Sequence, residues 1–291
     1  MHIPMYSHAI ISKSTHLFGV KANLQSKGRV ILTDLQLTNI LHLLSRDYSD
    51  LTYSSMSTPD QKKMCVVEGL ARRFISSLKL PSGLLMRDGH TCYCEECQTY
   101  LGRSGFTDYN YPKGWYLFRV NVSVPPERSL DEISNNWELC FHGTEVPCLE
   151  SILSLGLRTP GDKDLHGNEI NVLPWHVQQY NAPDGFDTER IFLSPSIRYA
   201  SNDIYALPYC YKSKKSGWTY RVKVVLMVHI RPGSYAVSGT TSGFNIDPSY
   251  PDDSIEWATN ESNSIVVKGV LVNFERYHCI GHIGGFHCST F

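Results

Sequence analysis

Residues 137–144, which read WELCFHGT, are the stretch of sequence that is most informative about the fold. Apolar side chains dominate its first five positions, so the stretch predicts a short buried strand. His142 then falls at the strand end, where an imidazole can hydrogen-bond a ligand hydroxyl. Gly143 has no Cβ, so a ligand can approach its backbone N–H and C=O closely. These two groups match the acceptor and donor of a carboxamide.

Two further stretches follow in a fixed order along the chain. Residues 190–199 read RIFLSPSIRY and predict a strand followed by a helix with Pro195 in its first turn. Ser196 and Tyr199 then share one helical face, which offers a hydroxyl to an amide and a ring to a planar cation. Glu256 lies in DDSIEW, residues 252–257, where neighbouring acids and partial burial are expected to raise its pKa.

This ordered set predicts a pocket for NAD. Cleavage of the bond between nicotinamide and ribose passes through an oxocarbenium-like transition state, as other glycoside cleavages do. A carboxylate near the sugar stabilises that cation and orients the incoming nucleophile. We therefore expect Glu256 to be the essential carboxylate of an enzyme. Taken singly, the residues have ordinary explanations: a strand end for His142, a helix cap for Ser196 and a core aromatic for Tyr199.

The arrangement resembles the poly(ADP-ribose) polymerase-like and diphtheria-toxin-like ADP-ribosyltransferase superfamily. It is more closely similar to the ADP-ribosyltransferase-like C-terminal region of Neuralized-like proteins. The resemblance covers roughly residues 80 to 275. It is most specific at six stretches: CYCEEC (92–97), GWY (114–116), FHGT (141–144), IFLSPSIRY (191–199), RPGSY (231–235) and IEW (255–257). The likeness implies an antiparallel-sheet catalytic domain of the α+β class.

The resemblance also assigns roles to residues. It implies that NAD is bound by six of them: His142, Gly143, Thr144, Phe192, Ser196 and Tyr199. His142 would hold the nicotinamide-side ribose, and Gly143 and Ser196 would hold the carboxamide. Tyr199 would stack on the nicotinamide ring. The catalytic residues implied by the likeness are Glu256, His142 and Tyr199.

The sequence departs from the family pattern in two places. Phe192 stands where the family usually carries the tyrosine of its His-Tyr-Glu triad, so the aromatic wall is kept and a hydroxyl is lost. Residues 263–267, NSIVV, resemble the final strand but lack a glutamate at its start. The assignment to Glu256 therefore depends on the Ile-Glu-Trp match, and Glu261 is the alternative carboxylate.

Nine cysteines form one tight cluster and scattered singles, which suits a reducing compartment with a metal site better than a disulfide framework. Cys94 and Cys97 have the spacing that lets two thiolates hold one zinc ion, and Cys92 can reach a third vertex. His90 is the local candidate for the fourth ligand. The tail offers distant candidates: His278, Cys279, His282, His287 and Cys288. We expect a closed structural zinc site; the alternative is a loop of free thiols.

Hydrophobic periodicity divides the chain into three regions. Residues 1–82 predict a helical N-terminal region. One helix of this region is expected to begin at Thr58-Pro59-Asp60 and to continue to Pro81. Residues 83–113 form a Cys-rich zinc-binding segment. Residues 114–291 predict the ADP-ribosyltransferase-like catalytic domain, with a helix at 146–155 and strands at 115–124, 137–141, 190–193, 220–230 and 264–274. Antiparallel strands with few helices make an α+β domain.

Composition sets general limits. A chain of 291 residues with 42% hydrophobic and 19% charged side chains can bury a sizeable core. A net charge of −1 gives no overall attraction to nucleic acid or to an anionic membrane. No run approaches the roughly 18 apolar residues of a membrane span, so a membrane partner is not expected. We expect an intracellular protein, cytoplasmic or nuclear. The first 33 residues contain no Asp or Glu, which leaves a mitochondrial transit segment open.

The expected function is transfer of one ADP-ribose from NAD to a macromolecular acceptor, a protein rather than a nucleic acid, with release of nicotinamide. Nothing in the sequence identifies a second site for a growing chain, so repeated addition is the less favoured outcome. The alternative is a catalytically weak NAD-fold module that binds a partner through its zinc knuckle, which Phe192 and the missing late glutamate favour.

Overall fold

The computed structural model describes residues 65–97, 106–121, 129–171, 187, 189–243 and 245–277 in full. It also gives the backbone of two short paired strands, β1 (Leu24–Gln25) and β2 (Arg29–Val30). The chain divides into two compact units, residues 1–61 and 62–291. The helix start expected at Thr58 and the zinc ligands expected after residue 277 lie outside the described residues.

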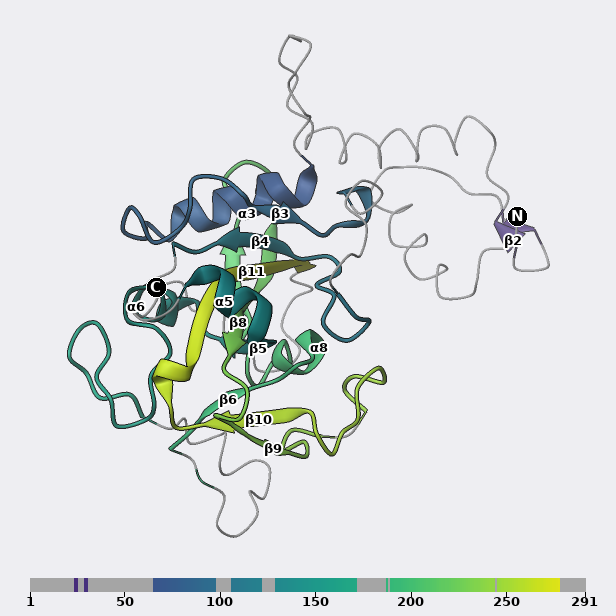
Figure 1. The fold of residues 1–291 in the computed structure, drawn as a ribbon. Helices are drawn as coiled ribbons and strands as arrows, with labels where there is room; N and C mark the ends of the chain where they lie inside the picture. The colour runs from purple at the N-terminus through teal and green to yellow at the C-terminus, as the bar shows by residue number, and fades with distance from the viewer. Residues whose placement is uncertain are drawn as a thin grey trace. The chain divides into compact units, whose positions relative to one another are not determined.

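A six-stranded antiparallel sheet forms the centre of the second unit (Figure 1). Its order is β3 (Thr91–Cys92), β4 (Tyr116–Arg119), β11 (Ile265–Tyr277), β8 (Thr219–Ile230) and β5 (Glu138–Thr144), and β7 (Tyr209–Lys212) also pairs with β8. The longest ladder joins β8 and β11, from Ile265 opposite Ile230 to Tyr277 opposite Thr219. The strands expected from the alternating apolar pattern at 220–230 and 264–274 are therefore confirmed.

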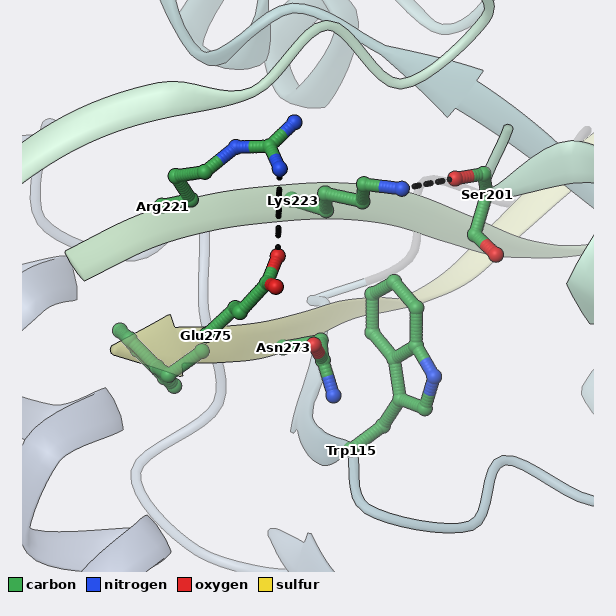
Figure 2. A pocket seen from close by; sticks show the side chains of 7 residues that line it. Trp115, Ser201, Arg221, Lys223, Asn273 and Glu275 are labelled. Atoms are coloured by element: carbon green, nitrogen blue, oxygen red, sulfur yellow. Dashed lines mark hydrogen bonds and ion pairs between the residues drawn. The ribbon is translucent and has the colours of Figure 1, made fainter. Parts of the chain in front are cut away.

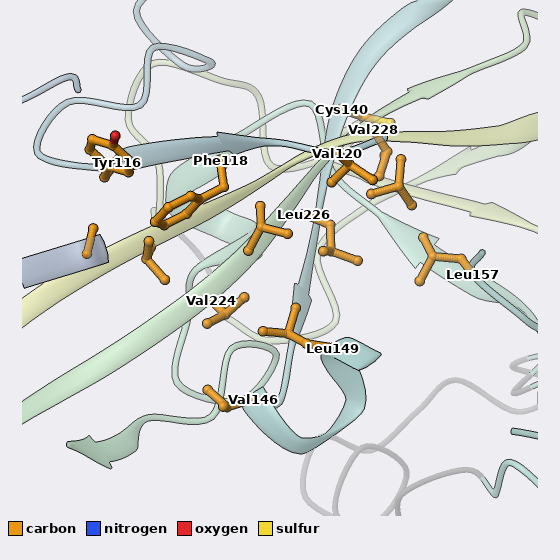
Figure 3. Close-up of a cluster of buried hydrophobic side chains, with 14 of the residues drawn as sticks. Tyr116, Phe118, Val120, Cys140, Val146, Leu149, Leu157, Val224, Leu226 and Val228 are labelled. Atoms are coloured by element: carbon orange, nitrogen blue, oxygen red, sulfur yellow. The ribbon is translucent and has the colours of Figure 1, made fainter. Parts of the chain in front are cut away.

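Side-chain alternation along β8 places this strand in the core. Its even-numbered apolar residues from 222 to 230 are all fully buried, because successive side chains of a strand point to opposite faces. Figure 3 shows Val224, Leu226 and Val228 in one apolar cluster with Phe118 of β4 and Leu149. Leu149 begins helix α6 (Leu149–Leu155), which follows a short 3-10 turn (Val146–Cys148) and ends before Gly156, as the sequence predicts.

Two further helices pack on the sheet. Helix α3 (Val66–Ser77) lies beside β3 and β4 in Figure 1, and its Phe74 is fully buried. The described helix begins at Val66, because Cys65 is extended and its Sγ caps the helix by accepting from the Glu68 N–H, so a single helix continuing to Pro81 from Thr58 is interrupted at Cys65. Helix α5 (Leu130–Asn136), capped by Ser129, was not indicated by the apolar periodicity.

A second antiparallel sheet of three strands has the order β6 (Ile191–Leu193), β10 (Glu256–Thr259), β9 (Ala236–Ser238). It meets the main sheet where Phe141 of β5 exchanges two backbone hydrogen bonds with Ser194, at 2.8 and 2.9 Å. Helix α8 (Ile197–Ala200) follows directly. Two antiparallel sheets with a few short helices form an α+β fold. In the described part of the chain, none of the helices has the length and apolarity required to cross a membrane.

Candidate functional site

A cavity of about 590 Å³ lies where β5, β6, β10 and the segment after α8 meet. These elements come together because β5 is linked to the end of β6 and β6 is paired with β10. Most of the residues singled out from the sequence line it: His142, Gly143, Thr144, Phe192, Tyr199 and Glu256. The three separated sequence stretches therefore contribute to one concave site.

Glu256 carries the most unusual carboxylate of this cavity. It begins β10 and is only 2% exposed. Its Oε2 accepts hydrogen bonds from the hydroxyls of Thr241 at 2.7 Å, Tyr199 at 3.0 Å and Tyr205 at 3.3 Å. Its Oε1 is buried and receives no hydrogen bond from any described residue. Burial raises the pKa of Glu256, and the hydrogen bonds from the three hydroxyls act in the opposite direction.

An unpartnered buried oxygen is costly, because it has lost its bonds to water without a replacement. Groups in this condition with a raised pKa are concentrated at functional sites. Glu256 lines a cavity, so a ligand hydroxyl entering that cavity is a candidate for the missing donor.

Two tyrosines build the aromatic wall of the site. The ring centroids of Tyr199 and Tyr205 are 5.3 Å apart, and their hydroxyl oxygens are 3.0 Å apart. The Tyr199 hydroxyl also accepts from the backbone N–H of Thr241 at 3.1 Å, and it lies 3.1 Å from Oγ1 of Thr240, which donates to the backbone oxygen of Gly243 at 2.7 Å. This network fixes the Tyr199 ring at the cavity, where a planar cationic ligand can pack against it. The sequence patterns did not indicate Tyr205, Thr240 or Thr241.

His142 is held in a defined orientation. Its Nδ1 lies 2.8 Å from the backbone oxygen of Phe192. Because a carbonyl oxygen only accepts, Nδ1 carries the proton and donates it. In a neutral ring with this tautomer, Nε2 is an acceptor, which is the property needed to receive a ribose hydroxyl.

Gly143 turns its backbone groups toward the β6 side of β5. Along an antiparallel strand the N–H and C=O groups of successive residues alternate between the two sides. Since Phe141 bonds Ser194 on the β6 side, Gly143 presents its N–H and C=O to that same side, where the cavity lies. A Cβ at position 143 would lie 2.2 Å from the backbone oxygen of Ala200. Glycine is therefore required at position 143 because the backbone of Ala200, and not only a ligand, approaches it closely.

Ser196 lies behind the cavity wall rather than in it. Its Oγ caps α8 by accepting from the Tyr199 N–H at 3.1 Å, and it donates to Oδ2 of Asp247 at 2.5 Å. Asp247 is 1% exposed and also accepts from Arg198 at 3.1 Å. The Ser196 hydroxyl thus fastens the loop before β10 onto α8, in contrast to the expected contact with a carboxamide. Ser194 lines the cavity instead.

The two competing glutamates occupy different environments. Glu256 lines the cavity, whereas Glu261 is absent from its wall, forms an ion pair with Arg231, and has a 45% exposed side chain. Phe192 contributes a half-buried ring to the wall from β6 and faces Ala258 across the strand pair. Of these two glutamates, Glu256 is the one that lines the cavity.

Four cysteines form a separate candidate metal centre. The Sγ atoms of Cys65, Cys92, Cys94 and Cys97 all lie within 4.8 Å of one another. The Sγ atom of Cys65 lies 3.3 Å from that of Cys92 and 3.8 Å from that of Cys94. Four thiolates about 2.3 Å from a tetrahedral zinc ion stand about 3.8 Å apart. The cluster can therefore hold a metal ion.

Cys65 is the fourth member of this group, and it lies too far along the chain from Cys92 to belong to a local cysteine motif. Its one signal is a cysteine placed directly before an amphipathic helix, which it caps. The hydrogen bond from Cys92 lowers the pKa of Cys65 to about 5, which favours the thiolate that binds metals. His90 lies outside the group: its Nδ1 accepts from the Arg119 N–H at 3.2 Å, and its ring packs on Phe118.

The other described cysteines differ from one another. Cys140 is a buried free thiol and Cys148 is an exposed one. Burial raises the pKa of both, so neither has the character of an activated nucleophile. Cys210 is disulfide-bonded, which the cysteine pattern did not predict.

A smaller cavity of about 370 Å³ lies at β8 and β11 (Figure 2). Its two cations are already paired within the protein. Arg221 contacts Glu275 at 3.3 Å and Asp203 at 2.8 Å, and Lys223 donates to the backbone oxygen of Ser201 at 2.8 Å. An anionic ligand would have to displace these partners, so this cavity is the weaker candidate site.

No protein-family model matches the chain. The first cavity offers four kinds of group to a ligand. These are a backbone donor and acceptor at Gly143, an imidazole of defined tautomer at His142, an aromatic wall at Tyr199 and a buried carboxylate with one unpartnered oxygen at Glu256.

Proposed function

We propose that the protein is an NAD-dependent mono-ADP-ribosyltransferase that modifies a protein acceptor. The observation that carries the proposal is the buried, unpartnered Oε1 of Glu256 in a cavity shared with His142 and Gly143. NAD offers groups that match each of these: a ribose with hydroxyls, a carboxamide and a planar cationic ring.

Each side chain has one task in the proposed reaction. The N–H and C=O of Gly143 pair with the carboxamide, and the ring of Tyr199 packs against the pyridinium. His142 accepts a hydrogen bond from one hydroxyl of the nicotinamide-side ribose, and Oε1 of Glu256 accepts one from another. These contacts orient the glycosidic bond and stabilise positive charge on the sugar where it develops.

The group transfer is balanced without a further co-reactant. The bond between ribose C1′ and the nicotinamide nitrogen breaks, and its electron pair leaves with nicotinamide. A nucleophile of the acceptor forms the new bond to C1′ and loses its proton to solvent or to the nearby carboxylate. The negative charge of Glu256 stabilises the cationic sugar between these two events.

The charges around the cavity favour a protein acceptor over a nucleic acid. Its wall contains four further carboxylates and two arginines: Glu145, Glu150, Asp164, Glu169, Arg158 and Arg190. A phosphate backbone is bound mainly through an excess of Lys and Arg, which this wall lacks. We propose transfer of a single ADP-ribose, because a second site for a growing chain is not indicated.

We further propose that zinc occupies the four-cysteine cluster. Four thiolates leave no open coordination position, so the ion would be structural. It would link Cys65 at the start of α3 to Cys92 of β3 and to Cys94 and Cys97 of the following turn. Helix α3 would thereby be fixed to the sheet through covalent coordination as well as through apolar packing.

The second candidate function is an NAD-binding module without turnover. Phe192 favours it, because the cavity wall carries no hydroxyl at that β6 position. Incubation of the purified protein with adenylate-labelled NAD and an acceptor mixture separates the two. We expect nicotinamide release together with label on protein, and a loss of on the order of 100-fold in rate for Glu256→Gln with NAD binding retained. Binding without any release would favour the module, and failure to bind NAD would refute both.

A further inference from the structure

We propose that Tyr205 and Thr241 are positioning residues for Glu256, which hold its Oε2 so that Oε1 is the oxygen presented to substrate. The inference rests on the proposed function and deepens it. It assigns a role to two side chains that lie in the segments after α8 and after β9, outside the sequence stretches that resemble a known family.

The first support is that three donors converge on one oxygen. Oε2 of Glu256 accepts from the hydroxyls of Thr241, Tyr199 and Tyr205, whereas Oε1 receives nothing from the described residues. A carboxylate oxygen offers about two lone pairs, so Oε2 is saturated. Partial rotation of the carboxylate would break all three bonds. A half-turn exchanges two equivalent oxygens and restores the same contacts, so the plane of the carboxylate, and with it the position of the oxygen without a donor, is fixed before substrate binds.

The second support is that the donors are themselves fixed to one another. The Tyr205 hydroxyl oxygen lies 3.2 Å from Oγ1 of Thr241, and the Tyr205 N–H donates to the backbone oxygen of Asn202 at 2.9 Å. The Thr241 N–H donates to the Tyr199 hydroxyl at 3.1 Å. The loop that carries Thr241 is also joined to α8 through the buried Asp247. The carboxylate is held by a preorganised frame from two separate segments.

The third support is electrostatic. The titratable and charged groups that line the cavity with Glu256 come from β5, α8 and the segments around them, and β9 contributes none: Tyr199, Tyr205, His142, His166, Cys148, Arg158, Arg190, Glu145, Glu150, Asp164 and Glu169. Burial raises the pKa of Tyr205, so its hydroxyl stays protonated and remains a donor. Because hydrogen bonds to the charged form lower a carboxyl pKa, removing one donor raises the pKa of Glu256 further.

The test compares Thr241→Val, which removes the hydroxyl at constant shape, with Thr241→Ser, which keeps it. Nicotinamide release is measured against pH at saturating NAD. For Thr241→Val and Tyr205→Phe we expect kcat to fall about tenfold at neutral pH with KM little changed, and the acidic limb to move up by about one pH unit. Thr241→Ser should follow wild type. The control is Ser254→Ala, whose hydroxyl bonds the exposed Asp253 carboxylate outside the cavity.

The outcomes separate this inference from the proposed function. If Glu256→Gln is inactive while Thr241→Val and Tyr205→Phe keep the wild-type pH profile, positioning is refuted and the transferase proposal stands. If wild type releases no nicotinamide, the transferase proposal fails, and the carboxyl ¹³C shift of Glu256 is titrated instead. A higher carboxyl pKa in Thr241→Val and Tyr205→Phe than in wild type and Thr241→Ser then supports positioning. An unchanged pKa overturns it.

Discussion

Replacing Glu256 by glutamine should stabilise the fold at neutral pH even though it abolishes the proposed chemistry. Glutamine keeps the shape of the side chain, and its carbonyl oxygen can still accept from Thr241, Tyr199 and Tyr205. What changes is the charge on Oε1, which is buried and unpartnered in the described structure. An unsatisfied charged acceptor is more costly than an unsatisfied neutral amide.

The size of the effect follows from this difference. An unsatisfied buried polar group costs about 1–3 kcal/mol, and a charged one costs more, so we expect Glu256→Gln to gain about 1 kcal/mol. For a unit of this size, that corresponds to a rise in Tm of about 2–4 °C. The control is Glu261→Gln, which alters a half-exposed ion pair with Arg231 and should change stability by about 0.5 kcal/mol or less.

The pH dependence gives the sharper assay. Burial raises the pKa of Glu256 above its ordinary value of 4.5, so the folded state binds more protons than the unfolded state from that pH upward. Wild-type stability therefore falls as pH rises through this window, and the advantage of Glu256→Gln grows over the same range and then levels off. Thermal unfolding of both proteins from acid to neutral pH measures it. A Glu256→Gln protein that is less stable than wild type throughout would show that the carboxylate has a partner.

Three further results are expected. Gly143→Ala should cost about 1–3 kcal/mol in unfolding experiments because its Cβ would overlap the Ala200 carbonyl, whereas Gly239→Ala, whose Cβ meets only ordinary contacts from 3.4 Å outward, should be tolerated. Protein purified without added metal should contain one equivalent of zinc by elemental analysis, which Cys65→Ser loses and the exposed Cys148→Ser retains; less than about half an equivalent in wild type would return the cluster to free thiols. Glu261→Gln should transfer ADP-ribose at the wild-type rate, and the reverse ranking against Glu256→Gln would mean that the carboxylate was assigned to the wrong residue.

Local sequence patterns predicted the longer strands and missed the short strands β3, β7, β9 and β10. Along β8 every even-numbered residue from 220 to 230 is aromatic or aliphatic, a period of two that predicts a strand, although Val225 and Met227 are apolar as well. The end of α6 was equally readable, because Gly156 adopts φ +81°, which favours glycine. The start of α3 is set by Cys65, whose thiol caps the described helix, and the local signal at Thr58-Pro59 lies outside the described residues.

The candidate site was only partly readable for a related reason. His142 and Gly143 could be selected because they end a strand that the apolar pattern predicts, whereas Glu256 was selected through the Ile-Glu-Trp match, where no strand was expected. Tyr205 and Thr241 stand in irregular segments, and their meaning lies in which atom they reach across the fold. Residue type and spacing carry no information about such convergence.

The difference between Ser196 and Thr241 shows what a pattern of residue types can and cannot assign. A serine before a short helix can serve a ligand or the helix itself, and the hydrogen bond to buried Asp247 decides for the helix. A threonine in a loop is not by itself a sign of function, yet the Thr241 hydroxyl makes the shortest of the three hydrogen bonds to Glu256. Since a hydroxyl can donate only one proton, each must commit to a single acceptor. The acceptor chosen, rather than the residue type, determines whether the side chain supports the fold or the carboxylate.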